Sequence, residues 1–262
     1  MVPRVLAIAG SDPSGGAGIQ ADLKTYAAFG VYGMTAITAL TVQNTVGVTR
    51  VVLTDPAVVR EQIRACLDDI GVDAIKIGML GSAAIIRAVA EEIRSLQVPI
   101  VVDPVMRAKG GDPLLEPEAE DAFREAIVPL ATVITPNLPE AEALLGFPVR
   151  DRVEMRRAAR ALAHQGVPAV LIKGGHLTDE QAADLLWYQA EENWLTAPRI
   201  QTHHTHGTGC TLSSAIAAGL ARGEAMAVAV AEAKRYVTKA IQDAPGLGHG
   251  HGPLWHHGWV RS

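Results

Sequence analysis

The chain has 262 residues, of which 48% are hydrophobic and 19% are charged, and its formal net charge is −5. This length lies within the range that an α/β fold fills as one unit, so we expect a single domain over residues 1–262. The sequence has no dense Lys/Arg run and no apolar segment near the roughly 20 residues of a membrane span, which argues against nucleic acid and membranes as partners. Only two cysteines, Cys66 and Cys210, and no recognisable export signal favour reduced thiols and a cytoplasmic location.

Short apolar segments alternate with amphipathic segments along the first half of the chain. We expect strands in VLAIAG (5–10), TAITALTV (35–42), VTRVVLT (48–54), AIKIGM (74–79) and IVVDPV (100–105). We expect helices near residues 17–29, 57–70, 82–96 and 117–127. Each apolar run is short and continuous, which is typical of strands that are buried on both faces of a parallel sheet.

The alternation continues through the second half of the chain. We expect strands in TVIT (132–135) and AVLIKGG (169–175), a hairpin over 183–197, and helices near 139–145, 151–164, 208–222 and 224–243. The glycine- and histidine-rich tail, residues 246–259, is expected to form an irregular arm. Repeated strand–helix units predict an α/β fold with a mostly parallel central sheet between two helical layers, whose ligands bind beyond the carboxyl ends of the strands.

The first motif with chemical content is GSDPSGGAGIQAD, residues 10–22. Residues 16–21 match the dinucleotide fingerprint G-x-G-x-x-G/A, so a hydride-transfer enzyme has to be considered. An insert at residues 11–15 separates this match from the strand, and the next strand ends in Gln43 and Asn44 with no acidic residue for a ribose. What remains is a glycine-rich loop that opens a helix, with Asp22 near the first turns, where the helix dipole favours a carboxylate.

The second motif is TPNLPEAEALLG, residues 135–146, which follows a predicted strand. Asn137 and Glu140 have the spacing of a capping box, in which each side chain accepts a hydrogen bond from the backbone of the other. Glu140 also lies beyond a strand end, where a carboxylate could hold Mg²⁺ through water. The two roles are compatible.

The third motif is HHTHGTGC, residues 203–210, which leads directly into an apolar helix. Its histidines and Cys210 could bind zinc, although no second ligand cluster is evident, and a cysteine nucleophile would need a histidine base held by a third group. The glycine turn suggests different chemistry. Its backbone N–H groups and the positive end of the helix dipole form an anion site suited to a phosphoryl group, and the same field should favour the Cys210 thiolate.

Together these segments resemble the ribokinase-like superfamily and, within it, the hydroxymethylpyrimidine/phosphomethylpyrimidine kinases of thiamine synthesis. The resemblance extends from AIAGSDPSGGAGIQADLKT through TALTVQNTVGV, KIGML, VVDPVM, TPNLPEAEALLG and VLIKGGH to HGTGCTLSSAIAA and GHGPLWHH. It implies ATP-dependent phosphorylation of 4-amino-5-hydroxymethyl-2-methylpyrimidine to the monophosphate and then to the diphosphate. It further implies Mg²⁺ as the metal and a homodimer.

The resemblance implies three groups of site residues. The group at the transferred phosphoryl is Gly207, Thr208, Gly209 and Cys210, with the cysteine at the position of the aspartate base of sugar kinases. The group at the pyrimidine is Gln43, Asp22, Gly10, Met79 and Val105. The ATP and metal side consists of Lys173, Asn137 and Asp103, with Glu140 holding Mg²⁺ through water.

Two alternatives stay open at the level of sequence. Some members of this branch accept pyridoxal, and Gln43 would favour the aminopyrimidine because an unpaired buried amide costs on the order of 1–3 kcal/mol. The other alternative is a non-catalytic metal-binding protein that uses the histidine-rich tail. The segment 107–112 is expected to form a flap over the site, and Gly110 stands where the family pattern would have serine, so this flap should be more mobile.

Overall fold

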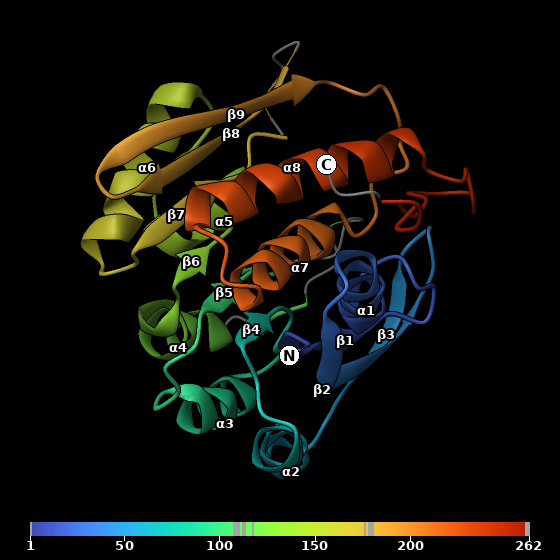
Figure 1. Ribbon diagram of the computed structural model, residues 1–262, viewed down its shortest axis with the longest axis vertical. Helices are drawn as coiled ribbons and strands as arrows, with labels where there is room; N and C mark the ends of the chain where they lie inside the picture. Colours follow the sequence, from blue (N-terminus) through green and yellow to red (C-terminus); the bar gives the residue numbers. More distant parts are fainter. Residues whose placement is uncertain are drawn as a thin grey trace.

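The computed structural model describes residues 2–106, 111, 114–116, 118–175, 177 and 181–259, so most of the expected flap lies outside the described residues. The strands of the described part form one nine-stranded sheet in the order β3-β2-β1-β4-β5-β6-β7-β8-β9 (Figure 1). Their bounds are β1 (Arg4–Ser11), β2 (Tyr32–Gln43), β3 (Val48–Leu53), β4 (Ala74–Ile77), β5 (Ile100–Val102), β6 (Val133–Ile134), β7 (Ala169–Ile172), β8 (Gln181–Tyr188) and β9 (Glu191–Pro198). The six neighbouring strands β2, β1, β4, β5, β6 and β7 are parallel, whereas β3 and the β8–β9 hairpin pair antiparallel at the two edges.

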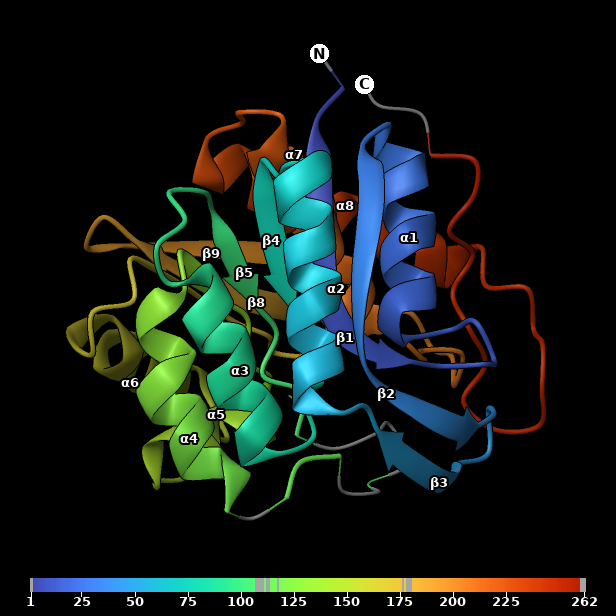
Figure 2. The ribbon, with the colours of Figure 1, turned by 90° about the horizontal axis from the view of Figure 1, so that it is seen from below.

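Helices cover both faces of the sheet, as Figures 1 and 2 show. The helices on one face are α2 (Pro56–Asp69), α3 (Ala83–Ile93), α4 (Ala119–Ala126), α5 (Leu138–Leu145) and α6 (Arg152–His164), with a short 3₁₀ turn over Val128–Leu130. Those on the other are α1 (Gly18–Phe29), α7 (Thr208–Ala221) and α8 (Met226–Gln242). Each face has its own apolar core, to which alternate residues of β1 contribute. The predicted three-layer α/β fold is confirmed.

The second strand begins earlier than the sequence predicted. It starts at Tyr32 rather than Thr35, and Gly33, which interrupts the apolar pattern, lies inside it. A Cβ at Gly33 would lie 2.6 Å from a ring carbon of Tyr26 in α1. The glycine therefore marks close packing of a helix on the strand, not a turn.

The tail after α8 is irregular, as expected, and it crosses a long distance over the surface (Figure 2). The backbone N–H of Trp255 donates to the carbonyl of Ala240 at 3.0 Å, and that of His251 donates to the carbonyl of Thr45 at 2.8 Å. The tail thus connects the end of α8 with the β2–β3 turn. Among the described residues, no helix combines the length and hydrophobicity needed to cross a membrane.

Candidate active site

The carboxyl ends of the parallel strands bring two groups of expected site residues to the same edge as the start of α7. Lys173 follows β7 and Asp103 follows β5, and the Lys173 Nζ lies 2.8 Å from Asp103 Oδ1. A Cβ at Gly209 would lie 3.2 Å from Lys173 Nζ and 3.3 Å from Asp103 Oδ2. The first turn of α7 is therefore packed directly on this ion pair, with room for a glycine and little more.

Helix α7 begins on a glycine that no other residue could easily replace. Gly207 is the N-cap, with a left-handed φ of 79°, and a Cβ there would lie 1.8 Å from the carbonyl oxygen of Gly16. Thr208 is the first helical residue, and its hydroxyl donates to the carbonyl of Thr205 at 2.8 Å. Helix α7 therefore starts at a fixed point beside Lys173 and Asp103, and the start of a helix can bind an anion.

The expected capping box at the start of α5 is confirmed. Asn137 Oδ1 accepts from the Glu140 N–H at 2.9 Å, and Glu140 Oε2 accepts from the Asn137 N–H at 2.7 Å. Lys173 Nζ lies 3.6 Å from the same Oε2. Because Glu140 Oε1 has no hydrogen-bond partner among the described residues, the capping role leaves one carboxylate oxygen that fits a hydrated Mg²⁺.

The pKa of the Glu140 carboxyl group lies near neutral pH. Burial raises its pKa to about 7, with Lys173 opposing and Asp103 adding to this shift. A nearby cation would favour the ionised carboxylate. A cation next to Glu140 would therefore increase the ionised fraction of its carboxyl group near neutral pH.

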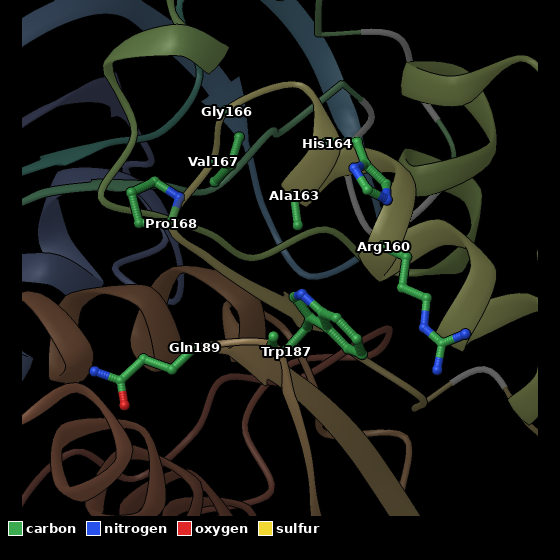
Figure 3. Close-up of a pocket in the computed structure, with 9 residues that line it drawn as sticks. Arg160, Ala163, His164, Gly166, Val167, Pro168, Trp187 and Gln189 are labelled. Atoms are coloured by element: carbon green, nitrogen blue, oxygen red, sulfur yellow. The ribbon is translucent and has the colours of Figure 1, made fainter.

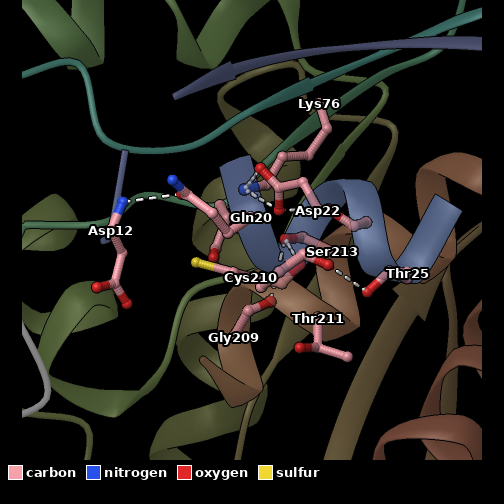
Figure 4. Close-up of polar contacts among 12 residues, drawn as sticks. Asp12, Gln20, Asp22, Thr25, Lys76, Gly209, Cys210, Thr211 and Ser213 are labelled. Carbon is pink, nitrogen blue, oxygen red and sulfur yellow. Dashed lines mark hydrogen bonds and ion pairs between the residues drawn. The ribbon is translucent and has the colours of Figure 1, made fainter. Parts of the chain in front are cut away.

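Cys210 lies in the first turn of α7, close to the buried ion pair of Asp22 and Lys76 (Figure 4). Burial raises the pKa of its thiol to about 11; Lys76 and the Gly18 backbone N–H lower it, while Asp22 and Asp103 raise it further. The expectation that the helix field would favour the thiolate is wrong, because desolvation and two carboxylates outweigh the favourable charges. At neutral pH the group is a thiol.

Asp22 occupies a different environment from the one expected. Its oxygens lie 2.9 and 3.0 Å from Lys76 Nζ (Figure 4). Ser214 Oγ donates to Asp22 at 2.6 Å, and both charged side chains are 0% exposed. Burial raises the pKa of Asp22 in spite of Lys76, and Asp22 in turn keeps the pKa of Lys76 above its ordinary value despite burial. The carboxylate presents no exposed atom to a ligand, so its direct contact with the substrate stays a prediction.

The remaining expected pyrimidine residues lie along the ends of β1, β2, β4 and β5. A Cβ at Gly10 would lie 3.0 Å from the sulfur of Met79, so these two residues are in contact. Gln43 ends β2, and its Oε1 lies 3.1 Å from the Thr41 hydroxyl, which is 3.0 Å from the carbonyl of Ser11. Val105 follows Asp103 and donates its N–H to the Asp103 carbonyl at 2.8 Å. Substrate contacts from these residues stay predictions.

Sequence reasoning missed three residues whose buried side chains support the site, namely Lys76, Asp12 and His206. Lys76 had a recognisable signal, since a lysine inside the buried strand AIKI requires a buried partner. Asp12 and His206 had none, because they are far apart in sequence. Their side chains meet at 2.7 Å, as described below.

The histidines of the third motif do not come together as zinc ligands. His206 is bound to Asp12, and the rings of His203 and His204 pack on each other at 3.9 Å between centroids. The described part of the chain contains no group of three or more His, Cys, Asp or Glu side chains that could hold a metal ion. Nothing in these residues therefore supports the zinc alternative.

A separate cavity of about 360 Å³ lies at the other edge of the sheet, between the end of α6 and the β8–β9 turn (Figure 3). Val167 and Pro168, which precede β7, form part of its wall, and Arg160 stacks over the ring of Trp187 at 5.0 Å. Because it lies at the amino ends of the strands, it is remote from the residues described above.

A mostly parallel sheet between two helical layers, with a glycine turn opening a buried helix at its carboxyl edge, defines a ribokinase-like kinase. The ADP complex of Bacillus subtilis pyridoxal kinase has this fold, with a TM-score of 0.91, 42% identity and 98% of each chain covered. The phosphomethylpyrimidine kinase family model matches residues 12–255. The chain belongs to this family.

Two curated relatives extend the comparison. The hydroxymethylpyrimidine/phosphomethylpyrimidine kinase of Streptomyces coelicolor is 51% identical, over 98% of this chain and 95% of its own length. The thiamine biosynthesis bifunctional protein ThiED of Geobacter sulfurreducens is 49% identical over 96% of this chain, which spans about half (52%) of that longer protein.

Proposed function

We propose that this protein transfers the γ-phosphoryl group of ATP to the hydroxyl of 4-amino-5-hydroxymethyl-2-methylpyrimidine, and then to the resulting monophosphate, giving the diphosphate used for thiamine diphosphate. Membership of the family over almost the whole chain supports this activity. The observation that carries it is the Gly207–Gly209 turn, whose helix start lies against Lys173 and Asp103. Phosphoryl transfer requires mainly positioning and charge stabilisation, which such a site supplies.

ATP and Mg²⁺ fit the acidic and basic groups beside this turn. Lys173 would contact the phosphates, with Asn137 and Asp103 on the same side, and Glu140 would hold the metal through water. A bound Mg²⁺ would offset the negative charge of the phosphates. The ADP complex of the Bacillus subtilis kinase is consistent with ATP as co-substrate.

The pyrimidine would bind beyond β1 and β2. Gln43 offers an amide that can both donate to and accept from an aminopyrimidine edge, and Gly10, Met79 and Val105 would line the ring. Pyridoxal is the second candidate substrate, because a solved pyridoxal kinase shares the fold at 42% identity. A pyridoxal ring cannot reproduce the paired amide contact.

One assay tests the proposal. Purified protein is given ATP and Mg²⁺ with, in turn, hydroxymethylpyrimidine, its monophosphate and pyridoxal, and ADP formation is measured. We expect turnover of both pyrimidines and weaker turnover of pyridoxal. Turnover of pyridoxal alone would overturn the assignment, and omission of Mg²⁺ should abolish the reaction.

We further propose one kinase domain over the whole chain, a cytoplasmic location and a homodimer. The edge of the sheet at β2 and β3 supports the dimer, because Leu40, Val42 and Val52 are 54%, 54% and 44% exposed there and Leu40 pairs with Val52 across the strands. Leu40→Glu should give a monomer in sedimentation analysis. Val153→Glu, at a 69% exposed valine of α6, is the control that should leave the mass unchanged. A monomeric unmodified protein at micromolar concentration would contradict the dimer.

A further inference from the structure

The loop before α1 and the turn before α7 are in direct backbone contact. A Cβ at Gly207 would overlap the carbonyl oxygen of Gly16, and a Cβ at Gly16 would lie 2.4 Å from the ring of His206. A Cβ at Gly18 would lie 2.4 Å from the carbonyl of Gly10, at the end of β1. The loop that carries the expected pyrimidine pocket is therefore packed closely against the anion turn, with glycine at the points of closest approach.

One buried side-chain pair spans this contact. His206 Nε2 lies 2.7 Å from Asp12 Oδ2, and the two residues are 5% and 3% exposed. Asp12 also accepts from the Ala17 N–H and from the Ser14 N–H and hydroxyl, each at 2.9 Å. Asp12 thus organises its own loop and, through His206, holds the residue that immediately precedes the anion turn.

The ionised state of Asp12 fits this role. Burial works to raise the pKa of Asp12, but the hydrogen bonds from His206 and Ser14 lower it below its ordinary value. An ionised carboxylate only accepts hydrogen bonds, so the His206 Nε2 carries a proton and donates it. The backbone N–H of His206 donates to the carbonyl of Gly252 at 3.0 Å, which fixes the histidine from the tail side.

We propose that Asp12 and His206 are positioning residues for the phosphoryl transfer: together they hold the Gly207–Gly209 amides in register with the loop that carries the acceptor pocket. The proposal rests on the proposed function. Both side chains are buried within the contact, so the proposed role is positioning and not contact with the reacting atoms. Loss of the contact lets the anion turn shift relative to the acceptor hydroxyl, and a displacement of about 1 Å in such a site can cost about a hundredfold in rate.

The chain offers a matched control in a second buried histidine. His256 is 3% exposed, and its Nε2 lies 2.9 Å from the Thr211 hydroxyl on α7. It ties the tail to the same helix one turn further on, and within the described part of the chain it forms no hydrogen bond with the loop of residues 12–18. A purely structural role for His206 predicts that the two histidines behave alike.

The experiment compares His206→Leu with His256→Leu, measuring kcat and KM for ATP and both pyrimidines together with Tm. We expect His206→Leu to lower kcat about ten- to a hundredfold with both pyrimidines while KM for ATP changes by less than about threefold. His256→Leu should lower Tm and leave kcat within about twofold. The proposal would be overturned if His206→Leu kept the kcat of the wild type. It would also be overturned if, in both variants, the loss of kcat were in the same proportion to the loss of Tm.

Two more conservative variants keep the proposal testable if a leucine variant does not fold. Gln at position 206 retains an N–H near the place of Nε2, so His206→Gln should keep kcat within about threefold of wild type and above that of His206→Leu. The double variant Asp12→Asn/His206→Gln should lose no more than the worse single variant, because both act through one contact. Additive losses of kcat would refute the proposal that the two residues act through one contact. An inactive wild-type protein would instead refute the proposed function.

Discussion

Replacing Lys76 with methionine would leave the Asp22 carboxylate fully buried and without its cation. Lys76 contacts both carboxylate oxygens, both side chains are 0% exposed, and only the Ser214 hydroxyl would still donate to the carboxylate. Breaking a buried pair from one side costs about 3–5 kcal/mol. In a domain of this length each kcal/mol corresponds to about 2 °C, so Tm should fall by about 6–10 °C.

The reciprocal variant Asp22→Asn should lower the free energy of unfolding by a similar amount, because it leaves the ammonium group of Lys76 buried without its partner charge. The double variant Lys76→Met/Asp22→Asn removes both charges, so its free energy of unfolding should lie within about 1–2 kcal/mol of the wild-type value. Thermal and urea unfolding measure all four proteins. A double variant no more stable than the worse single variant would refute the reasoning, because the pair would then not be the source of the loss.

The same four proteins decide the role of Asp22 toward the substrate. If the carboxylate contacts the pyrimidine directly, the double variant regains stability but keeps a raised KM for the pyrimidine. If Asp22 serves only Lys76, stability and KM recover together. The burial of Asp22 favours the second result.

Three further predictions follow from the same geometry. The ratio of wild-type to Cys210→Ala rates should change little between pH 7 and 9, both for the alcohol step and for the monophosphate, whose oxygen is already ionised, because a thiol whose pKa is raised to about 11 stays mostly protonated over this range; a ratio that rises with pH for the alcohol step alone would contradict this. Gly207→Ala should abolish activity and lower Tm because its Cβ would overlap Gly16, whereas Gly223→Ala, at an equally left-handed φ of 81° with open space around it, should cost only about 1–2 kcal/mol; equal unfolding losses would count against the loop contact. Burial lowers the pKa of His256 to about 4, so the unfolded chain binds the proton more readily and stability on the order of 3 kcal/mol should be lost as pH falls from about 6.5 to 4; His256→Gln should flatten that dependence in urea unfolding.

The architecture could be predicted because its signals are local. Continuous apolar strands, helical periodicity and the Asn137–Glu140 spacing each depend on a few neighbouring residues, and the structure contains the corresponding elements within one to three residues of the expected ends. The late start predicted for β2 shows the limit of this approach. Gly33 breaks the local pattern for a reason, the Tyr26 ring, that belongs to another element.

The connections within the site could not be predicted because they join residues that are distant in sequence. His206 and Asp12 are separated by 194 residues, and Ser214 and Asp22 by 192. No periodicity or motif spacing links such positions. Sequence reasoning placed Asp22 and Cys210 at the site, but it could not determine that Lys76 pairs with Asp22 or that burial would dominate the pKa of the thiol.

The charges around the start of α7 explain why a neutral cysteine suits the proposed reaction. Lys76 is paired with Asp22, and Lys173 is paired with Asp103, so neither lysine adds a free positive charge. A thiolate at Cys210 would place a negative charge in the first turn and cancel the field of the amides there. With its pKa raised to about 11, the thiol leaves that field available. The backbone of the glycine turn, held by Asp12 and His206, can then direct its amides at the transferred phosphoryl oxygens, where negative charge develops.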